Sequence, residues 1–222
     1  EDALKHREKV RPYKLNNVYF GPEFSNEDIE KAIKEEKLKG EFVKKIEKYV
    51  AEEISNKRVV GHFDGKMEYG PRALGNMSIL YDPTDAKINN WLNARLARTE
   101  FMPFAPSLLD TAAPDFYINY NKNKYPAQFM TITFHNTKDA QFAKAVVHVD
   151  NTTRPQVVSK EQNPRYYKIL TEYDQITGMP IFVNTSFNIH EEPIVCSPKD
   201  AVRSFKKGTV DTLVMGNWVV RR

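Results

Sequence analysis

Hydrophobic and polar positions along this chain follow two periods, one typical of helices and one of strands. Apolar spacing of three and four residues, together with capping residues, predicts helices at residues 25–39, 41–55, 163–178 and 197–207. Short apolar runs predict strands at residues 59–63, 78–81, 156–158, 179–183, 211–215 and 218–221. Because helices and strands alternate, the pattern predicts the α/β class with a mixed sheet.

The helix ends carry recognisable signals. Ser25 with acidic residues in the following turn predicts an N-cap, and Asn163-Pro164 predicts another with proline in the first helical position. A further helix is expected after the turn at 82–85. The helix at 163–178 should end at Gly178, and its buried stripe is predicted to be Tyr166, Ile169, Leu170, Tyr173 and Ile176.

The segment from residue 100 to residue 149 has a weaker pattern. Two prolines bracket the apolar stretch 100–109, which favours an edge strand or a rigid approach to a site. Residues 110–127 are rich in Pro, Asn, Lys and Tyr, which predicts a loop with a short helix at 113–117. Residues 128–134 and 144–149 are predicted to be two more strands.

Composition fits a globular protein that lies outside the membrane. Of the 222 residues 41% are hydrophobic and 28% charged, and no apolar run reaches the roughly 20 residues of a membrane span. The net charge of +4 suits an anionic ligand, but acids and bases are interspersed, so nucleic acid is not favoured. The single cysteine, Cys196, excludes an internal disulfide, fits the cytoplasm and is expected to be a buried, inert thiol.

Residues 61–76 form the first candidate site, because they contain four of the nine glycines and a proline between two predicted strands. Lys66, Glu68, Arg72 and Asn76 lie between the glycines. A shaped loop that carries such groups is typical of a binding site. A long surface turn with solvated charges explains the same pattern equally well.

Residues 184–188 form the second candidate site, at the carboxyl end of an apolar strand where ligands gather in open α/β sheets. Arg154 follows another strand. If these segments converge with Arg72, two guanidinium groups and several small polar groups would line an anion pocket. The alternative is that the asparagines only form a turn and that Arg154 pairs with Asp150.

Other chemistries have weaker support. The chain has no Gly-x-x-x-x-Gly-Lys-Ser/Thr and no Gly-x-Gly-x-x-Gly motif. Its histidines and Cys196 show no metal-ligand spacing, so we expect no metal site. Ser186 has no base near it in the sequence. His148 is either a satisfied histidine on a sheet or part of a polar cluster with Asp150 and Arg154.

Several motifs together resemble the NodU-type O-carbamoyltransferases, in the order and spacing of that family. The resemblance runs from about Val18 to Arg221, and the motifs are residues 67–76, 103–107, 148–156, 184–188 and 192–195. In that family an actin-like N-terminal domain holds iron and transfers the carbamoyl group to a hydroxyl. A YrdC-like C-terminal domain converts carbamoyl phosphate and ATP to carbamoyl adenylate.

The resemblance implies that residues 25–222 are the C-terminal domain and that residues 1–24 are a linker or edge segment from a preceding domain. The implied fold is a twisted mixed β-sheet flanked by helices, of the YrdC kind. Mg²⁺ would accompany ATP, and iron is expected only in the N-terminal domain of the same protein. Complete carbamoyl transfer would need both domains. The acceptor hydroxyl stays unnamed, and a homodimer stays open.

The resemblance also implies roles for individual residues. It assigns catalysis to Arg154, Ser186 and Asn188, and substrate or nucleotide binding to Glu68, Arg72, Arg98, His148, Asp150 and Asn184. This chain departs from the family's Lys-x-Arg pair, since Ala97 and Thr99 occupy those positions, and Met102 replaces a later arginine. Arg98 or Arg95 would substitute if the register has shifted. Without such a substitute, phosphate affinity or substrate identity would differ from the typical member. The alternative functions are a non-catalytic YrdC-like module, which the missing pair favours, and an RNA-binding one, against which the interspersed charges argue.

Overall fold

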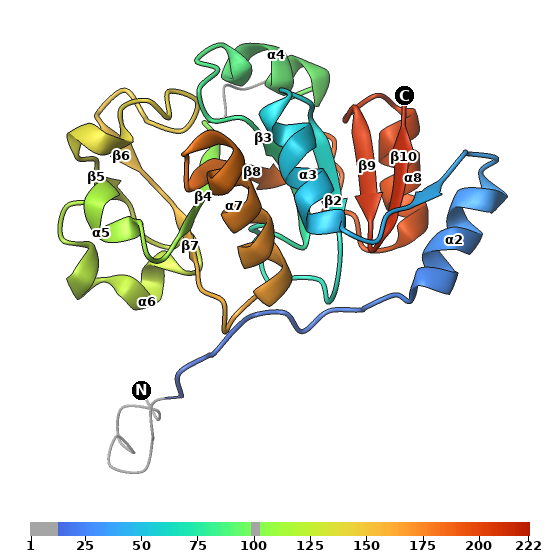
Figure 1. Ribbon diagram of the computed structural model, residues 1–222, viewed down its shortest axis with the longest axis horizontal. Helices are drawn as coiled ribbons and strands as arrows, with labels where there is room; N and C mark the ends of the chain where they lie inside the picture. Colours follow the sequence, from blue (N-terminus) through green and yellow to red (C-terminus); the bar gives the residue numbers. More distant parts are fainter. Residues whose placement is uncertain (1–12, 99–102) are drawn as a thin grey trace.

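The computed structural model describes residues 13–98 and 103–222 (Figure 1). Its α-helices are α2 (Asn26–Glu35), α3 (Ile46–Ser55), α4 (Ile88–Arg95), α5 (Ala113–Phe116), α6 (Lys124–Ala127), α7 (Pro164–Thr177) and α8 (Pro198–Lys206). Its strands are β1 (Glu41–Phe42), β2 (Val60–Phe63), β3 (Met77–Tyr81), β4 (Ala105–Leu109), β5 (Phe134–His135), β6 (Thr152–Thr153), β7 (Gln156–Val158), β8 (Ile181–Ser186), β9 (Thr212–Met215) and β10 (Trp218–Arg221). Two short 3₁₀ turns are η2 (Tyr120–Lys122) and η3 (Lys138–Ala140).

One eight-stranded sheet organises the molecule, in the order β1-β10-β9-β2-β3-β8-β4-β7. The β9–β2 and β4–β7 pairs are parallel and the other pairs are antiparallel. A separate two-stranded sheet joins β5 and β6. The mixed α/β class predicted from the sequence is therefore confirmed.

Helices cover both faces of this sheet. On one face α3 and α7 lie side by side (Figure 1) and bury apolar residues against β2, β3 and β8. The opposite face is covered by α2, α4, α8 and the segment 113–146. Strands β2 and β3 are buried along their whole length, because both of their faces are covered. The sheet core thus fixes the loop between β2 and β3, the first candidate site.

Local signals set the helix ends as the sequence predicts. The Ser25 and Asp28 side chains cap α2 reciprocally. At the start of α7 the Asn163 side chain accepts a hydrogen bond from the Tyr166 N–H, and Pro164 takes the first position. Gly178 ends this helix in the left-handed conformation, with φ of 71°.

Two predicted elements near the sheet edges need correction. Residues 41–55 are not one helix, because Glu41 and Phe42 pair with β10 as strand β1 and only then does α3 begin. The Phe42 ring packs edge-on against Trp218, with centroids 5.5 Å apart. Strand β4 is not an edge strand, since it lies between β8 and β7. Pro106 is tolerated there because the β4–β7 ladder begins only at the next residue, Ser107.

The two strands predicted at 128–134 and 144–149 do not form. Turns occupy most of this region instead, and β5 covers only Phe134 and His135. The Ala143 N–H donates to the Ala140 carbonyl and the Val146 N–H to the Ala143 carbonyl. These local bonds use backbone groups that a strand would offer to a neighbour. Buried apolar residues produced the strand-like alternation here without strand pairing.

Residues 18–22 belong to the folded body. The Gly21 N–H donates to the Met67 carbonyl, and the Tyr69 N–H donates to the Val18 carbonyl. The Tyr19 hydroxyl donates to the Leu74 carbonyl at 2.8 Å. This part of the predicted linker therefore acts as an edge segment that packs on the 61–76 loop.

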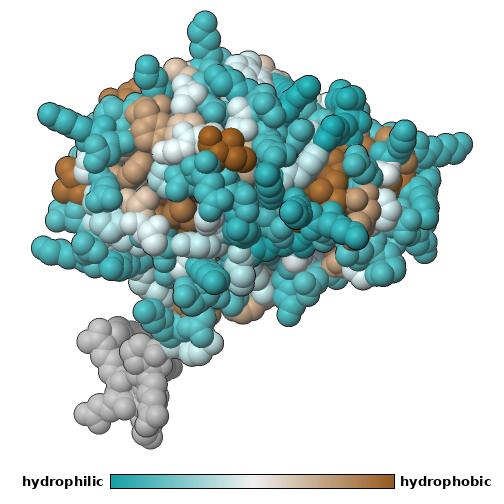
Figure 2. Space-filling view, in the orientation of Figure 1, coloured by the Kyte–Doolittle hydropathy of each residue, from teal (hydrophilic) through white to brown (hydrophobic). Residues whose placement is uncertain are grey.

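Two residues that the sequence predicted to be buried are exposed. Ile176, in the last turn of α7, is 44% exposed, and the Cys196 thiol is exposed rather than buried. Most of the surface seen in Figure 2 is hydrophilic, with small scattered apolar patches. Within residues 13–98 and 103–222, none of the helices has the length and apolar character needed to cross a bilayer.

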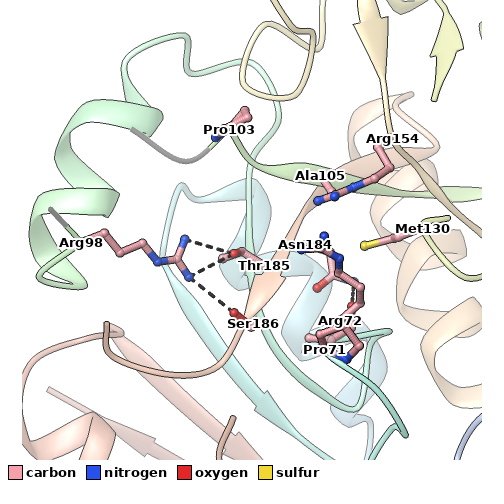
Figure 3. Close-up of a pocket in the computed structure, with 11 residues that line it drawn as sticks. Pro71, Arg72, Arg98, Pro103, Ala105, Met130, Arg154, Asn184, Thr185 and Ser186 are labelled. Carbon is pink, nitrogen blue, oxygen red and sulfur yellow. Dashed lines mark hydrogen bonds between the residues drawn. The ribbon is translucent and has the colours of Figure 1, made fainter. Parts of the chain in front are cut away.

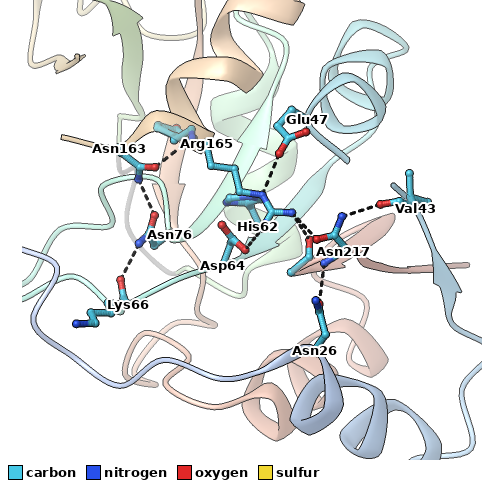
Figure 4. A network of polar contacts seen from close by, with 12 residues as sticks. Asn26, Val43, Glu47, His62, Asp64, Lys66, Asn76, Asn163, Arg165 and Asn217 are labelled. Carbon is cyan, nitrogen blue, oxygen red and sulfur yellow. Dashed lines mark hydrogen bonds and ion pairs between the residues drawn. The ribbon is translucent and has the colours of Figure 1, made fainter. Parts of the chain in front are cut away.

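Arg165 on α7 connects three segments below the sheet (Figure 4). Its guanidinium pairs with Glu47 of α3 at 3.2 Å and with Asp64 after β2 at 2.8 Å. It also donates to the Asn217 side chain, in the turn between β9 and β10, at 2.9 Å. The arginine side chain is only 30% exposed, so these pairs are partly shielded from solvent.

We expect Arg165→Ala to lower the free energy of unfolding by about 1–2 kcal/mol, since it leaves two half-buried carboxylates without their cation. The measurement is the urea midpoint. Lys168→Ala on the same helix is the matched control, because its i,i+4 pair with Glu172 is 53% exposed on the lysine side and should contribute about 0.5 kcal/mol or less. Equal effects of the two substitutions would contradict the bridging role of Arg165.

Candidate functional site

Three arginine side chains from distant parts of the chain line one cavity at the end of the sheet (Figure 3). Arg72 comes from the 61–76 loop, Arg98 from the end of α4 and Arg154 from the link between β6 and β7. The remaining lining residues are Pro71, Ala73, Pro103, Ala105, Met130, Asn184, Thr185 and Ser186. None of these lining residues is acidic, so the cavity suits an anion.

Arg98, and not Arg95, supplies the cation from α4. Its guanidinium donates to the Thr185 hydroxyl at 3.3 Å and to the Ser186 hydroxyl at 3.5 Å. Its own burial lowers the pKa of Arg98. Arg95 points elsewhere, since it donates to the Gly208 carbonyl at 2.6 Å and pairs with Asp211 at 2.8 Å. Of the two arginines predicted as possible substitutes for the Lys-x-Arg pair, only Arg98 lines the cavity.

Three positions depart from the cationic residues of the family, namely Ala97, Thr99 and Met102. Thr99 and Met102 lie outside the residues that the structure describes. Ala97 is exposed and adopts a left-handed φ of 55°, directly before Arg98. This conformation ends the helical turn after α4, so that Arg98 is the residue that lines the cavity.

Arg154 offers an unused donor. Its Nε atom is buried and has no hydrogen-bond partner in the structure. Burial lowers the pKa of Arg154, and the positive charge of Arg72 lowers it further. In the alternative interpretation Arg154 would pair with Asp150. The Asp150 carboxylate instead accepts two hydrogen bonds from Thr152, from its N–H at 3.0 Å and from its hydroxyl at 2.7 Å. Two close guanidinium groups without a carboxylate favour a bound anion.

Glu68 organises the loop from within. One carboxylate oxygen accepts hydrogen bonds from the N–H groups of Leu74 and Asn76, both at 2.7 Å, and from Met77 at 3.1 Å. Burial raises the pKa of Glu68, and these backbone bonds oppose that rise. Glu68 is only 5% exposed and does not line the cavity. The contacts of Glu68 are those of a structural residue, and its role in substrate binding stays a prediction.

Gly75 allows the loop to fold against α7. Its φ is +107°, a conformation that L side chains rarely adopt. A Cβ atom there would lie 2.5 Å from the Tyr166 ring. The Gly75 carbonyl accepts a hydrogen bond from His62 Nδ1 at 2.6 Å, and burial lowers the pKa of this histidine. Residues 73–76 of the glycine-rich loop are thus buried and tightly held, whereas residues 69–72 at its tip are exposed.

Asn184 and Asn188 do not offer their amide nitrogens to an anion, which corrects the expectation for both. The Asn184 Nδ2 atom donates to the Ala73 carbonyl at 3.2 Å, and the Asn188 Nδ2 atom donates to the Glu192 carbonyl at 2.9 Å. The Oδ1 atom of each is buried and has no partner. The side-chain nitrogens of both residues are thus occupied by bonds within the protein, and Asn188 does not line the arginine cavity. Nor do they form a simple turn, since Asn184 lies within β8.

His148 and Asp150 belong to a turn beside the site. Neither lines the arginine cavity, and their contact with substrate stays a prediction. The His148 Nδ1 atom lies 3.3 Å from the Thr152 hydroxyl. Burial lowers the pKa of His148, Asp150 opposes this and the charge of Arg154 reinforces it. The two residues shape the turn that leads to Arg154.

The sequence interpretation missed the buried polar residues behind the cavity. Gln156 and Ser107 are 3% and 0% exposed, yet both make side-chain hydrogen bonds to Asn184. The sequence did offer one indication of Gln156, because it is a polar residue inside a predicted apolar strand. A polar side chain buried in a strand must find a hydrogen-bond partner. Among the described residues, His, Cys, Asp and Glu side chains form no group of three that could hold a metal ion.

Comparison with known proteins agrees with this geometry. A family model described as "Carbamoyltransferase C-terminus" matches residues 51–222. An uncharacterised protein of Methanocaldococcus jannaschii is 41% identical over 94% of this chain and 41% of its own length. The nodulation protein NolNO of Sinorhizobium fredii is 35% identical over 94% of this chain and 31% of its own length. The chain therefore spans less than half of these curated relatives.

A solved structure of full-length HypF in the phosphate- and nucleotide-bound form has a TM-score of 0.56 and 17% identity, covering 80% of this chain and 22% of that one. This likeness shows a shared fold. The family model covers more than half of the chain, and the M. jannaschii protein matches nearly all of it. On this evidence the chain belongs to the carbamoyltransferase C-terminal family.

Proposed function

We propose that this chain binds carbamoyl phosphate and ATP and forms carbamoyl adenylate, as the C-terminal part of an O-carbamoyltransferase. The observation that carries the proposal is the convergence of Arg72, Arg98 and Arg154 on one cavity without an acidic lining residue. Guanidinium groups match the geometry of phosphate oxygens. A preceding N-terminal domain of the same cytoplasmic protein would then transfer the carbamoyl group to a hydroxyl.

The reaction needs the charges that this cavity provides. Conversion of carbamoyl phosphate and ATP to carbamoyl adenylate consumes one water and releases phosphate and pyrophosphate. Negative charge builds up on the non-bridging oxygens during each step at phosphorus. Fixed cations that line the cavity would stabilise that charge, and one well-placed donor typically lowers the barrier by about 3 kcal/mol.

A second, larger cavity adjoins the first and suits a nucleoside. Its volume is about 580 Å³, and it shares Pro71, Arg72, Met130 and Arg154 with the arginine cavity. Its other lining residues are largely apolar or aromatic, namely Leu15, Val18, Tyr69, Leu74, Tyr125, Phe129 and Thr131. An apolar pocket beside phosphate-binding groups is typical of nucleotide sites. Mg²⁺ would enter bound to the phosphates and water, since the lining residues of both cavities include no carboxylate.

Isothermal titration of the 222-residue chain with carbamoyl phosphate, and separately with ATP and Mg²⁺, tests the proposal. We expect saturable binding of each below millimolar concentration. Arg98→Ala should weaken binding about tenfold, because it removes a charge-assisted donor. Arg95→Ala is the matched control: it removes an arginine from the end of the same helix, but one that pairs with Asp211 outside the cavity.

Absence of saturation with both ligands at millimolar concentration would overturn the proposal. That outcome would favour a non-catalytic module that only supports its partner domain. Equal losses for Arg98→Ala and Arg95→Ala would show that net charge, and not the cavity, governs binding.

A further inference from the structure

Arg72 lies on the exposed tip of the 61–76 loop. Residues 69–72 are exposed, whereas residues 73–76 are buried. Among residues 13–98 and 103–222, no carboxylate forms an ion pair with Arg72. Only four residues lie between Tyr69 and Leu74, and Pro71 among them has a fixed φ. The position of Arg72 therefore depends on what holds the two ends of this tip.

The extended segment that leads into α2 (Figure 1) holds the first end of the tip. The Gly21 N–H donates to the Met67 carbonyl at 2.9 Å, and the Met67 N–H donates to the Pro22 carbonyl at 3.0 Å. The Tyr69 N–H donates to the Val18 carbonyl at 2.7 Å. A Cβ atom at Gly21 would lie 2.7 Å from the Met67 Cβ atom, so glycine permits this close approach. We call residues 18–22 the strap.

Tyr19, within the strap, holds the other end of the tip. Its hydroxyl donates to the Leu74 carbonyl at 2.8 Å, and burial raises the pKa of Tyr19, so the hydroxyl stays protonated. Tyr19 also packs against the buried cluster of Leu74, Ala105 and Met130. Ala105 and Met130 line the arginine cavity. One strap residue thus connects the second end of the tip to the wall of that cavity.

We propose that Tyr19 is a positioning residue for Arg72, because the strap holds both ends of the loop tip and so keeps this guanidinium at the arginine cavity. The inference rests on the proposed function and deepens it. A short segment between anchored ends has little freedom, since its reach is limited. Displacement of the strap would shift Arg72, whereas Arg98 and Arg154 lie on other segments and would keep their places. The segment before α2 therefore controls one of the three cations in the cavity.

Tryptic cleavage between Arg72 and Ala73, identified by mass spectrometry, tests the hold on the tip without any ligand. Ala73 is buried, so trypsin reaches this bond only when the tip opens locally. Tyr19→Phe removes the hydroxyl and keeps the ring, and we expect it to raise the cleavage rate about fivefold. Tyr13→Phe is the matched control, because Tyr13 lies on the same segment but is 83% exposed. It should leave the rate unchanged.

A second bond separates local opening from global unfolding. The bond between Arg165 and Tyr166 lies in α7, and Tyr166 is 0% exposed. If the strap acts on the tip, Tyr19→Phe leaves the cleavage rate at this bond within about twofold of the unmodified protein. Equal acceleration at both bonds would show that Tyr19 supports the whole fold, and unchanged cleavage after Arg72 would show that it does not hold the tip. Either result would overturn the inference.

Titration of the full 222-residue chain with carbamoyl phosphate tests the consequence for the cavity. Tyr19→Phe should weaken binding about threefold to fivefold, because Arg72 then spends less time at the ligand. In a protein that already carries Arg72→Ala, the added Tyr19→Phe should change the affinity by less than about twofold. Additive losses would show that Tyr19 acts on the cavity by another route, and would overturn the inference.

Gly21→Ala displaces the strap by a different route. Its Cβ atom would push the strap away from Met67 and leave the Tyr19 hydroxyl in place. We expect faster cleavage after Arg72 and weaker binding, as for Tyr19→Phe. Failure of the unmodified protein to bind carbamoyl phosphate would overturn the proposed function alone, because the tryptic rates of the variants would still decide whether Tyr19 positions Arg72.

Discussion

Arg154→Ala should weaken the binding of carbamoyl phosphate on the order of 30-fold or more, equivalent to about 2 kcal/mol. The substitution removes a guanidinium whose buried Nε has no partner within the protein. Among residues 13–98 and 103–222 no carboxylate forms an ion pair with Arg154, so the loss should appear in ligand binding and not in folding. In a protein that completes the whole reaction, loss of one such donor typically lowers kcat about 10²–10³-fold.

Arg154→Lys should recover only part of this loss. Lysine restores the charge but not the fork of donors or the Nε group. Isothermal titration gives the affinities, and circular dichroism establishes that each variant is folded. Arg203→Ala is the matched control, because that side chain is 57% exposed on α8 and pairs with Asp200. Unchanged binding in a folded Arg154→Ala variant would remove Arg154 from the site.

Glu68→Ala should lower the free energy of unfolding by about 3 kcal/mol or more, the largest effect on stability that we expect. The carboxylate satisfies three backbone N–H groups, of Leu74, Asn76 and Met77, and the alanine variant leaves all three without it. Each buried donor without a partner costs about 1–3 kcal/mol. Because the same bonds shape the loop that carries Arg72, anion binding should weaken as well.

Glu68→Gln separates hydrogen bonding from charge. The amide oxygen can still accept from the loop, so we expect a cost of about 1 kcal/mol, since bonds to a charged acceptor are stronger than bonds to a neutral one. Urea denaturation gives the free energies. Glu23→Ala, at an exposed site, should stay within about 0.5 kcal/mol of the unmodified protein. A stability loss for Glu68→Ala no larger than for Glu23→Ala would contradict the clamp role.

The sequence predicted those elements that depend on neighbouring residues, and it failed where an element depends on residues far away along the chain. The helix at 163–178 was predicted within one residue at each end, because Asn163, Pro164 and Gly178 act on neighbours within one helical turn. The strands predicted at 128–134 and 144–149 failed, because strand formation needs a partner that apolar alternation alone does not supply. Strand β1 was missed for the complementary reason, since its partner β10 lies at the other end of the chain.

In the candidate site, too, the sequence indicated some residues and distant contacts decided others. Motifs in the sequence indicated Arg72, Arg154 and the segment 184–188, and the structure brings Arg72, Arg154 and residues 184–186 together at one cavity. The choice of Arg98 over Arg95 depended on Asp211 and the Gly208 carbonyl, both more than 100 positions away, which hold Arg95 outside the cavity. Sequence spacing carries no information about such contacts.

The sequence alone determined the α/β class, the main helix ends, the family resemblance and most residues of the arginine cavity. Tertiary structure alone decided that Glu68 holds the loop from within, and that the Asn184 side-chain nitrogen donates to Ala73 and Gln156. The physical reason is that a side chain's type fixes which donors and acceptors it has, whereas their direction depends on the partners that folding brings near. For Asn184 those partners, Ser107 and Gln156, lie 77 and 28 positions away along the chain.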